Sequence, residues 1–226
     1  MKHHPYVPNP GHVLTRRHTT VDQVHAMMLA AIAGGDLLPG QELRDQAWAA
    51  ELKVSRTPIR EAIKRLEAHG IVDIAAARYT RLASFTPDEA RREAHDWAAI
   101  HLALVSDLCE SAERPLILAL EKARSRFHGS TGIKAHAANF TFFEHLRATS
   151  TSFSVHLGAV AVAYRLRLAL PNLPDLHDAD DQLHTDILAA LTEHKADTLA
   201  PSFTRWLHAA NHEPAAESSL APTQLS

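Results

Sequence analysis

The sequence predicts a mainly helical protein in two parts: a small N-terminal unit of three helices and a β-hairpin, then an antiparallel bundle of about six helices. Three observations predict this arrangement. A basic amphipathic segment at 54–70 follows two shorter amphipathic segments, two short β-branched runs come next, and from Thr86 onward glycine is scarce and the apolar spacing is helical. The predicted boundaries are 1–18 for a flexible arm, 19–84 for the first unit, 85–213 for the bundle and 214–226 for a disordered tail.

The first two helices are predicted at 21–34 and 43–52. Apolar residues recur at helical spacing in the first, which ends at Gly34-Gly35. Pro39-Gly40 marks a turn between the two helices. The residues of the second helix predicted to face the core are Leu43, Ala47, Trp48 and Leu52.

The segment from Val54 to Gly70 is predicted to be a helix with one apolar and one basic face. Ser55 is a good N-cap, Pro58 lies in the first turn, where its missing N–H breaks no helical bond, and Gly70 stops the helix. The apolar stripe is Ile59, Ala62, Ile63 and Leu66, and the other side chains are Arg56, Thr57, Arg60, Lys64 and Arg65. Guanidinium groups suit bidentate contacts with guanine and phosphate, although a solvated basic face on an ordinary helix is the plainer alternative.

The neighbouring segments favour DNA reading over the plainer alternative. Two helices joined by a tight turn make a helix-turn-helix, whose second helix enters the major groove. The runs 71–74 and 79–82 are rich in β-branched and apolar residues and are predicted to pair as a hairpin. The predicted N-terminal unit is therefore a winged helix-turn-helix.

Residues of about 20 to 84 resemble the DNA-binding domain of the GntR family of bacterial transcription regulators. The matching motifs are Leu38-Pro39-Gly40, the segment from Val54 to Ala62, and Leu66-Glu67 followed by Gly70-Ile71-Val72. The resemblance implies that Arg56 and Arg60 are the main groove contacts, with Ser55 and Thr57 on phosphates or base edges. The full set of expected DNA-binding residues is Arg44, Gln46, Ser55, Arg56, Thr57, Arg60, Lys64 and Arg78.

Three positions depart from the GntR pattern. Gln46 stands where many relatives have an arginine, and Tyr79 occupies the usual wing-tip glycine, so the wing is expected to differ in shape and its minor-groove contact falls to Arg78 or Arg81. Lys53 stands where the turn usually has glycine. If its φ is positive, lysine there costs up to roughly 1 kcal/mol.

Composition favours a regulator over a nucleic-acid coat protein. The 226 residues carry a net charge of −3, so the positive charge of the basic helix is local. Cys109 is the single cysteine, which excludes a disulfide within the chain and is consistent with a reducing cytoplasm. No apolar stretch is expected to reach the roughly 20 residues of a membrane span, and the N-terminal arm lacks the apolar core of a secretory signal. Within that arm Arg16, Arg17 and His18 are possible phosphate contacts.

The second part is predicted to be entirely helical. Thr86-Pro87-Asp88-Glu89 is a capping box with proline at the first helical position. The six predicted helices are 86–111, 115–128, 133–149, 152–170, 178–192 and 195–212. Such a bundle behind a GntR reader resembles the FadR subfamily, whose C-terminal FCD domain binds an effector between helices. The segments that resemble it best are 139–146 and 181–191.

Many FCD domains hold a divalent metal with one aspartate and three histidines. By resemblance these positions fall on Asn139, Phe143, His184 and Trp206, of which only His184 is a metal-ligand type. The family metal site is therefore expected to be lost, and no cofactor is expected. The alternatives are a rearranged histidine site formed by His208 and His212 with His101, His145 and His184, or an effector pocket lined by Asn139, Phe143, His184, Trp206 and His101. Core packing is the plainer interpretation of the aromatic residues among them.

The expected function is a sequence-specific transcription regulator, a repressor, that binds double-stranded DNA as a homodimer on a pseudo-palindromic operator. The resemblance implies control by a small organic acid or similar metabolite. One alternative is a constitutive DNA-binding dimer whose pocket is filled by side chains. The other is a histidine-dependent metal hydrolase, which lacks a recognisable catalytic motif such as His-Glu-x-x-His. No membrane partner and no enzymatic activity are expected.

Overall fold

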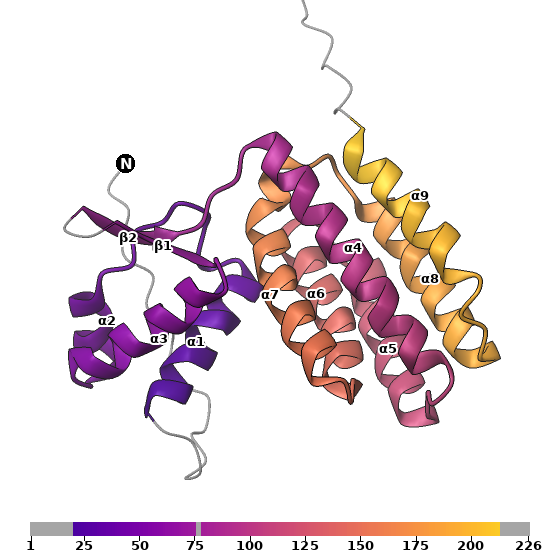
Figure 1. Cartoon of the computed structure of the whole chain (residues 1–226), viewed down its shortest axis with the longest axis horizontal. Coiled ribbons are helices and arrows are strands. Elements are labelled where there is room, and N and C mark those ends of the chain that lie inside the picture. The colour runs from indigo at the N-terminus through magenta and orange to yellow at the C-terminus, as the bar shows by residue number, and fades with distance from the viewer. Residues whose placement is uncertain (1–19, 76–77, 213–226) are drawn as a thin grey trace, which may run out of the picture.

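The computed structural model describes residues 20–75 and 78–212. The predicted arm 1–18, with Arg16, Arg17 and His18, and the tail 214–226 lie outside the described residues. The protein has a small N-terminal unit beside a helical bundle (Figure 1). The predicted fold class, a winged helix-turn-helix followed by a helical bundle, is confirmed.

The N-terminal unit contains three helices and a hairpin. These elements are α1 (Thr20–Gly34), α2 (Asp45–Leu52), α3 (Arg56–Ala68), β1 (Val72–Ala75) and β2 (Tyr79–Leu82). The strands pair antiparallel, with Val72 opposite Leu82 and Ala75 opposite Tyr79. In α2, Trp48 and Ala49 are buried, and Leu52 packs half-buried against the same core as predicted. The prediction that Ala47 faces the core is wrong, because Ala47 is half-buried and lines an open groove. The helix begins at Asp45, two residues after the predicted start.

Lys53 joins α2 to α3 in the left-handed conformation, with φ 53° and ψ 41°. Its backbone N–H closes α2 by donating to the carbonyls of Ala49 and Ala50. A side chain with a Cβ is strained in this region, whereas glycine is not. The departure from the GntR glycine therefore places strain in the turn.

We expect Lys53→Gly to raise the free energy of unfolding by about 0.5–1 kcal/mol, because it removes the Cβ strain of the left-handed turn. Urea denaturation measures the change. Lys53→Ala is the matched control, since it removes the long side chain but keeps the Cβ. An equal gain from both variants would contradict strain as the cause.

The bundle contains six helices among the described residues. They are α4 (Pro87–Cys109), α5 (Arg114–His128), α6 (Gly132–Thr149), α7 (Phe153–Ala169), α8 (His177–Glu193) and α9 (Leu199–Asn211), with a short 3-10 turn, η1 (Leu170–Asn172), after α7. The predicted capping box at the start of α4 is present, because the Thr86 hydroxyl accepts from the Glu89 N–H and the Glu89 carboxylate accepts from the Thr86 N–H. The predicted start of α9 at 195 is wrong. His194 takes a left-handed conformation, with φ 55°, and the chain turns before the helix begins.

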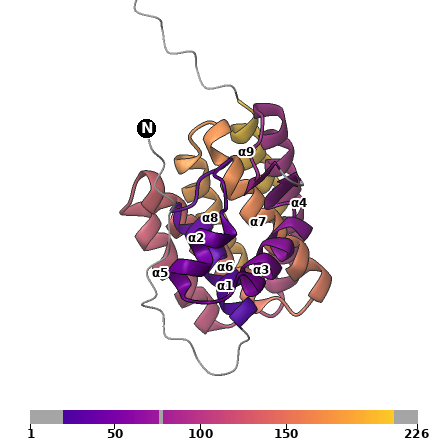
Figure 2. The same cartoon turned by 90° about the vertical axis from the view of Figure 1, so that its left-hand side faces the viewer.

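Helix α7 packs against both parts of the protein (Figures 1 and 2). Ala163 and Leu166 belong to the bundle core, whereas Tyr164 and Leu168 are buried in the core of the N-terminal unit. Arg165 extends the contact by donating to the Gly70 carbonyl at 3.3 Å. Helix α6 also contacts α1, so α6 and α7 together join the N-terminal unit to the bundle.

The apolar character of α7 corrects the prediction that no stretch reaches the length of a membrane span. The segment Phe153–Asn172 has 20 residues and a mean hydropathy of 1.3, and it meets that criterion by length and composition only. A core helix of a folded protein meets the same criterion. In this fold the segment contributes to the two cores, and its guanidinium groups on Arg165 and Arg167 donate to Glu93 and to the Ala33 carbonyl.

Candidate DNA-binding surface and effector cavity

The basic helix predicted from the sequence is α3, and its two faces are separated as expected. The four residues of the apolar stripe are buried: Ile59, Ala62, Ile63 and Leu66. Arg56, Arg60 and Lys64 point outward, with side chains 52%, 61% and 65% exposed. Ser55 is the N-cap residue with extended backbone, but its hydroxyl makes no capping hydrogen bond. The helix is held by its apolar face, and its cationic groups are exposed on the opposite face.

An open groove lies between α3, the start of α2 and the hairpin. Its lining includes six of the eight residues predicted to bind DNA: Arg44, Gln46, Arg56, Arg60, Lys64 and Arg78. Ser55 and Thr57 are exposed on α3 but do not line this groove. The groove also exposes apolar and aromatic surface at Ile74 and Tyr79. A concave, mainly cationic surface of this kind suits the phosphate backbone and base edges of duplex DNA.

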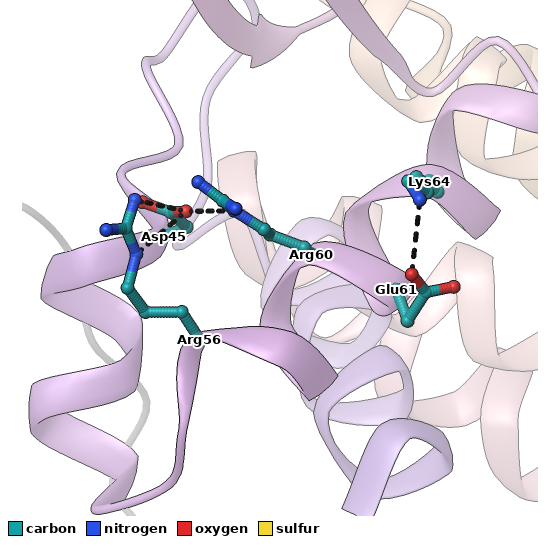
Figure 3. A network of polar contacts seen from close by, with 5 residues as sticks. All are labelled: Asp45, Arg56, Arg60, Glu61 and Lys64. Atoms are coloured by element: carbon teal, nitrogen blue, oxygen red, sulfur yellow. Dashed lines mark hydrogen bonds and ion pairs between the residues drawn. The ribbon is translucent and has the colours of Figure 1, made fainter.

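Asp45 lies at the centre of this surface and was missed in the sequence. Its carboxylate accepts from Arg56 Nε at 3.2 Å and Arg56 Nη2 at 2.9 Å, and from Arg60 Nε at 2.7 Å (Figure 3). Burial alone would raise the pKa of Asp45, but the hydrogen bonds and charges of Arg60 and Arg56 lower it below its usual value. The sequence shows Asp45 only as an acidic residue near the start of a predicted helix. Its ion-pair partners lie 11 and 15 residues away on another helix, and no periodic pattern of the sequence links them to it.

Tyr79 changes the wing in a defined way. It is the first residue of β2 and pairs with Ala75, so the tyrosine extends the strand at the point where a glycine would allow a tighter turn. The Arg81 guanidinium lies 4.2 Å from the centre of the Tyr79 ring. Arg81 is thereby drawn toward Tyr79 and Asp73, whereas Arg78 lines the groove.

A polar cluster lies inside the bundle where α6, α8 and α9 meet. The buried Asp180 carboxylate accepts from Trp206 Nε1 at 2.7 Å and from Asn139 Nδ2 at 2.9 Å. The Asn139 Oδ1 lies 2.8 Å from His184 Nε2. Since Asn139 uses its NH₂ group on Asp180, its oxygen accepts from a protonated Nε2, which fixes the histidine tautomer. Three of the predicted pocket residues thus meet around Asp180.

Asp180 was not predicted as a site residue, because the segment that resembles the FCD domain was taken to start at Asp181. The signal was its i, i+4 spacing from His184, which places both side chains on one face of α8. Burial raises the pKa of Asp180 to about 7, against the opposing hydrogen bonds from Trp206 and Asn139. Burial lowers the pKa of His184 to about 3.

A second buried polar pair lies nearby and contains the predicted pocket residue His101. Its Nδ1 lies 2.9 Å from the Trp97 carbonyl and therefore donates, so Nε2 accepts from Arg147 Nη1 at 3.3 Å. Burial, reinforced by the Arg147 charge, lowers the pKa of His101 to about 3. Among the described residues no carboxylate pairs with Arg147, whose side chain lies over the Phe140 ring.

A small cavity of about 30 Å³ adjoins both polar groups. Asn139, Phe143, Trp206, Asp180 and Arg147 are among its lining residues. The predicted pocket residues His184 and His101 do not line it, but they bond to Asn139 and Arg147, which do. The structure therefore brings the five predicted pocket residues into one polar region.

The residues present do not fit the metal that the FCD resemblance implies. Phe143 carries no ligand atom, and the Trp206 indole N–H donates to Asp180. Within residues 20–75 and 78–212, no group of three or more His, Cys, Asp or Glu side chains gathers as a metal site. The ring centres of His208 and His212 lie 4.2 Å apart, and His101, His145 and His184 do not gather with them as a group of metal ligands among the described residues.

Comparison with known proteins identifies the N-terminal unit. Residues 20–81 match the gntR family of bacterial regulatory proteins. These residues form a GntR-family helix-turn-helix domain. Because the GntR family consists of regulatory proteins, the alternative of a metal-dependent hydrolase is set aside.

Solved structures of GntR-type proteins share the whole architecture. McbR/YncC of E. coli superimposes with a TM-score of 0.65 at 15% identity, over 84% of this chain and 94% of that chain. A GntR transcriptional regulator from Rhodococcus sp. RHA1 also gives a TM-score of 0.65, at 19% identity, over 83% of this chain and 95% of that chain. At these identities the likeness shows the fold alone. A search of curated proteins gives no match.

Proposed function

We propose that this protein is a cytoplasmic transcription repressor of the FadR subfamily, which binds a pseudo-palindromic operator as a homodimer and responds to a small metabolite bound in the bundle. The observation that carries the proposal is the cationic groove between α3 and the hairpin, in a domain that matches the GntR family. Five cationic side chains line that groove: Arg44, Arg56, Arg60, Lys64 and Arg78. Glu42 and Asp45 also line the groove, so five cations face two carboxylates there, whereas the whole chain has a net charge of −3.

An exposed apolar surface on the bundle supports the homodimer. Phe153 at the start of α7 is 79% exposed, and Leu157, one turn later, is 43% exposed. Large apolar side chains gathered on a surface mark interaction sites. A second copy is the partner that a palindromic operator requires, because two-fold DNA symmetry needs two reading helices.

We expect Phe153→Asp combined with Leu157→Asp to convert a dimer into a monomer, because two carboxylates cannot be buried together in an apolar interface. Sedimentation velocity measures the mass. Leu118→Asp is the matched control, since Leu118 is 50% exposed on α5. A dimer that survives the double substitution would place the interface elsewhere.

The buried polar region of the bundle supports effector binding. Arg147 supplies a guanidinium with no carboxylate partner among the described residues, and it adjoins the same cavity as Asp180 and Asn139. A buried guanidinium without a directly paired carboxylate suits a carboxylate ligand, in keeping with a small organic acid. Helix α7 lines this cavity with Ala163 and Leu166 and also packs on the reader, so a ligand that moves α7 changes the reader's position.

The small size of the cavity favours one alternative, a constitutive DNA-binding dimer. About 30 Å³ holds water rather than a metabolite unless side chains move. Thermal denaturation across a panel of small organic acids separates the two functions. A rise in the melting temperature with one acid supports the ligand-gated regulator, and no shift with any acid supports the constitutive dimer.

The proposed regulation is tested by mapping the DNA that the protein occupies in its own cells, together with transcript levels after deletion of its gene. A repressor occupies promoters that share one inverted-repeat motif, and the neighbouring transcripts rise when the gene is removed. Falling transcripts would contradict repression. The absence of occupied sites would contradict the regulator itself.

A further inference from the structure

Two arginines on α7 hold the ends of two helices of the N-terminal unit. Arg165 Nη1 donates to the Gly70 carbonyl, and Arg167 Nε donates to the Ala33 carbonyl, each at 3.3 Å. Ala33 lies in the last turn of α1, and Gly70 lies two residues after the end of α3. Carbonyl groups at the C-terminal end of a helix lack intrahelical partners and carry the negative end of the helix dipole, so they attract guanidinium groups.

The backbone of the N-terminal unit leaves room for both guanidinium groups. Gly35 follows α1 with φ 83°, and a Cβ there would collide with the Arg167 guanidinium. Gly70 follows α3 with φ 65°, and a Cβ there would collide with the Arg165 guanidinium. Both close approaches depend on a residue without a side chain.

The two arginines differ in what else holds them. Arg165 is fixed to α4, because its Nε and Nη2 donate to the carboxylate of Glu93, which is only 6% exposed. Arg167 forms no ion pair with a carboxylate in the described part of the chain, and burial lowers its pKa from the usual value. Arg167 is therefore a half-buried cation whose contact with α1 is made to a neutral carbonyl.

Arg167 also lines the cavity of the bundle, together with Arg147. One side chain thus reaches both the N-terminal unit and the proposed effector site. A guanidinium forms shorter and stronger hydrogen bonds with a carboxylate than with a neutral carbonyl, so an acid in the cavity competes with Ala33 for Arg167. Arg165 does not line the cavity and already holds a carboxylate, so the acid leaves its contact in place.

We infer that Arg167 is the positioning residue through which an acid in the cavity releases the N-terminal unit from its DNA-binding arrangement. The inference rests on the proposed function and deepens it by naming the residue that carries the regulation. The acid takes the Arg167 guanidinium, Ala33 loses its donor, and the α1 side of the contact loosens while Arg165 keeps the α3 side. The acid then weakens operator binding by the same factor by which the operator weakens binding of the acid.

Three variants separate this coupling from a loss of charge. Arg167→Met is the decisive variant, because it keeps an apolar stem and removes every donor. Arg167→Lys keeps the cation but cannot hold a carboxylate with two parallel donors. Arg126→Met is the matched control, since Arg126 is exposed on α5, which contacts α6 and α8, and does not line the cavity.

The measurement is binding of the full-length protein to its selected operator, with acetate as the probe acid and chloride at equal ionic strength as the control anion. We expect acetate to weaken operator binding by the wild type and by Arg126→Met about five- to ten-fold. Arg167→Met should bind the operator about five- to ten-fold more weakly than the wild type without acetate, and acetate should weaken it no further. Arg167→Lys should fall between the wild type and Arg167→Met in both measurements.

A full response to acetate in Arg167→Met would overturn the inference and leave the proposed regulator intact, even if that variant binds the operator weakly. A wild type that selects its operator but does not respond to acetate would also overturn the inference alone. A wild type without any preferred sequence would overturn the proposed DNA-binding function together with it. If Arg167→Met does not fold, a response of Arg167→Lys equal to that of the wild type would overturn the inference.

Discussion

We expect the free energy of unfolding of Asp180→Asn, measured relative to the wild type, to increase with pH. The difference should be about 4 kcal/mol larger near pH 8 than near pH 4. The folded protein raises the pKa of the buried Asp180 from 3.8 to about 7. Between these values the folded state keeps a proton that the unfolded chain has released. The contribution to stability is therefore complete below about pH 4 and is lost as the pH rises through about 7. Asparagine carries no such proton and still offers an oxygen to Trp206.

Urea denaturation of both proteins from about pH 4.5 to about pH 8 measures this difference. The buried His101 and His184 have pKa values lowered to about 3 and act in the opposite direction, since they favour the folded state as the pH rises from about 3 through 6.5. They are common to both proteins and cancel in the comparison. Asp181→Asn is the control, because Asp181 is partly exposed and paired with Arg124 at 3.1 Å. A pH-independent difference for Asp180→Asn would contradict a buried, proton-binding carboxylate.

Arg60→Ala is expected to weaken specific DNA binding by roughly 1–3 kcal/mol and to relax selectivity at one base pair of each half-site. Arg56→Ala is expected to weaken specific binding as well, because both arginines line the groove. Titration of operator, single-base variants and random duplex separates a loss of selectivity from a uniform loss of affinity.

The control for these substitutions is Arg65→Ala. Arg65 lies on the same helix but outside the groove, where it donates to Asp22 at 2.7 Å. It should leave selectivity unchanged. A uniform loss from Arg60→Ala, independent of sequence, would instead make Arg60 a phosphate contact.

Apolar spacing and capping motifs predicted helix α3 and the start of α4, because these features depend on residues close together in the sequence. The stripe from Ile59 to Leu66 indicated α3 because helical spacing alone decides which side chains of that helix are buried. The capping box at Thr86 likewise marked the start of α4. The start of α9 was missed because His194 ends the preceding helix in a left-handed conformation, and no glycine or proline marks the turn that follows before Leu199.

The centres of both candidate sites were missed for one physical reason. Asp45 and Asp180 act on residues that are distant in the sequence, and no periodicity links a carboxylate to partners on other helices. The aromatic and histidine positions of the bundle could be placed by resemblance, but resemblance could not show that Trp206 donates to the Asp180 carboxylate. The dual packing of α7 was also hidden, because apolar residues on several of its faces give no single amphipathic stripe that would mark one core.

The most direct test of the central claim, that α3 reads DNA in the major groove, is selection of bound sequences from a random duplex library at about 150 mM salt. The wild type is compared with the Arg56→Ala, Arg60→Ala double variant. We predict a short inverted-repeat motif that the wild type enriches and the double variant does not. Salt-sensitive binding without sequence enrichment, shared by both proteins, would contradict the assignment of α3 as the reading helix.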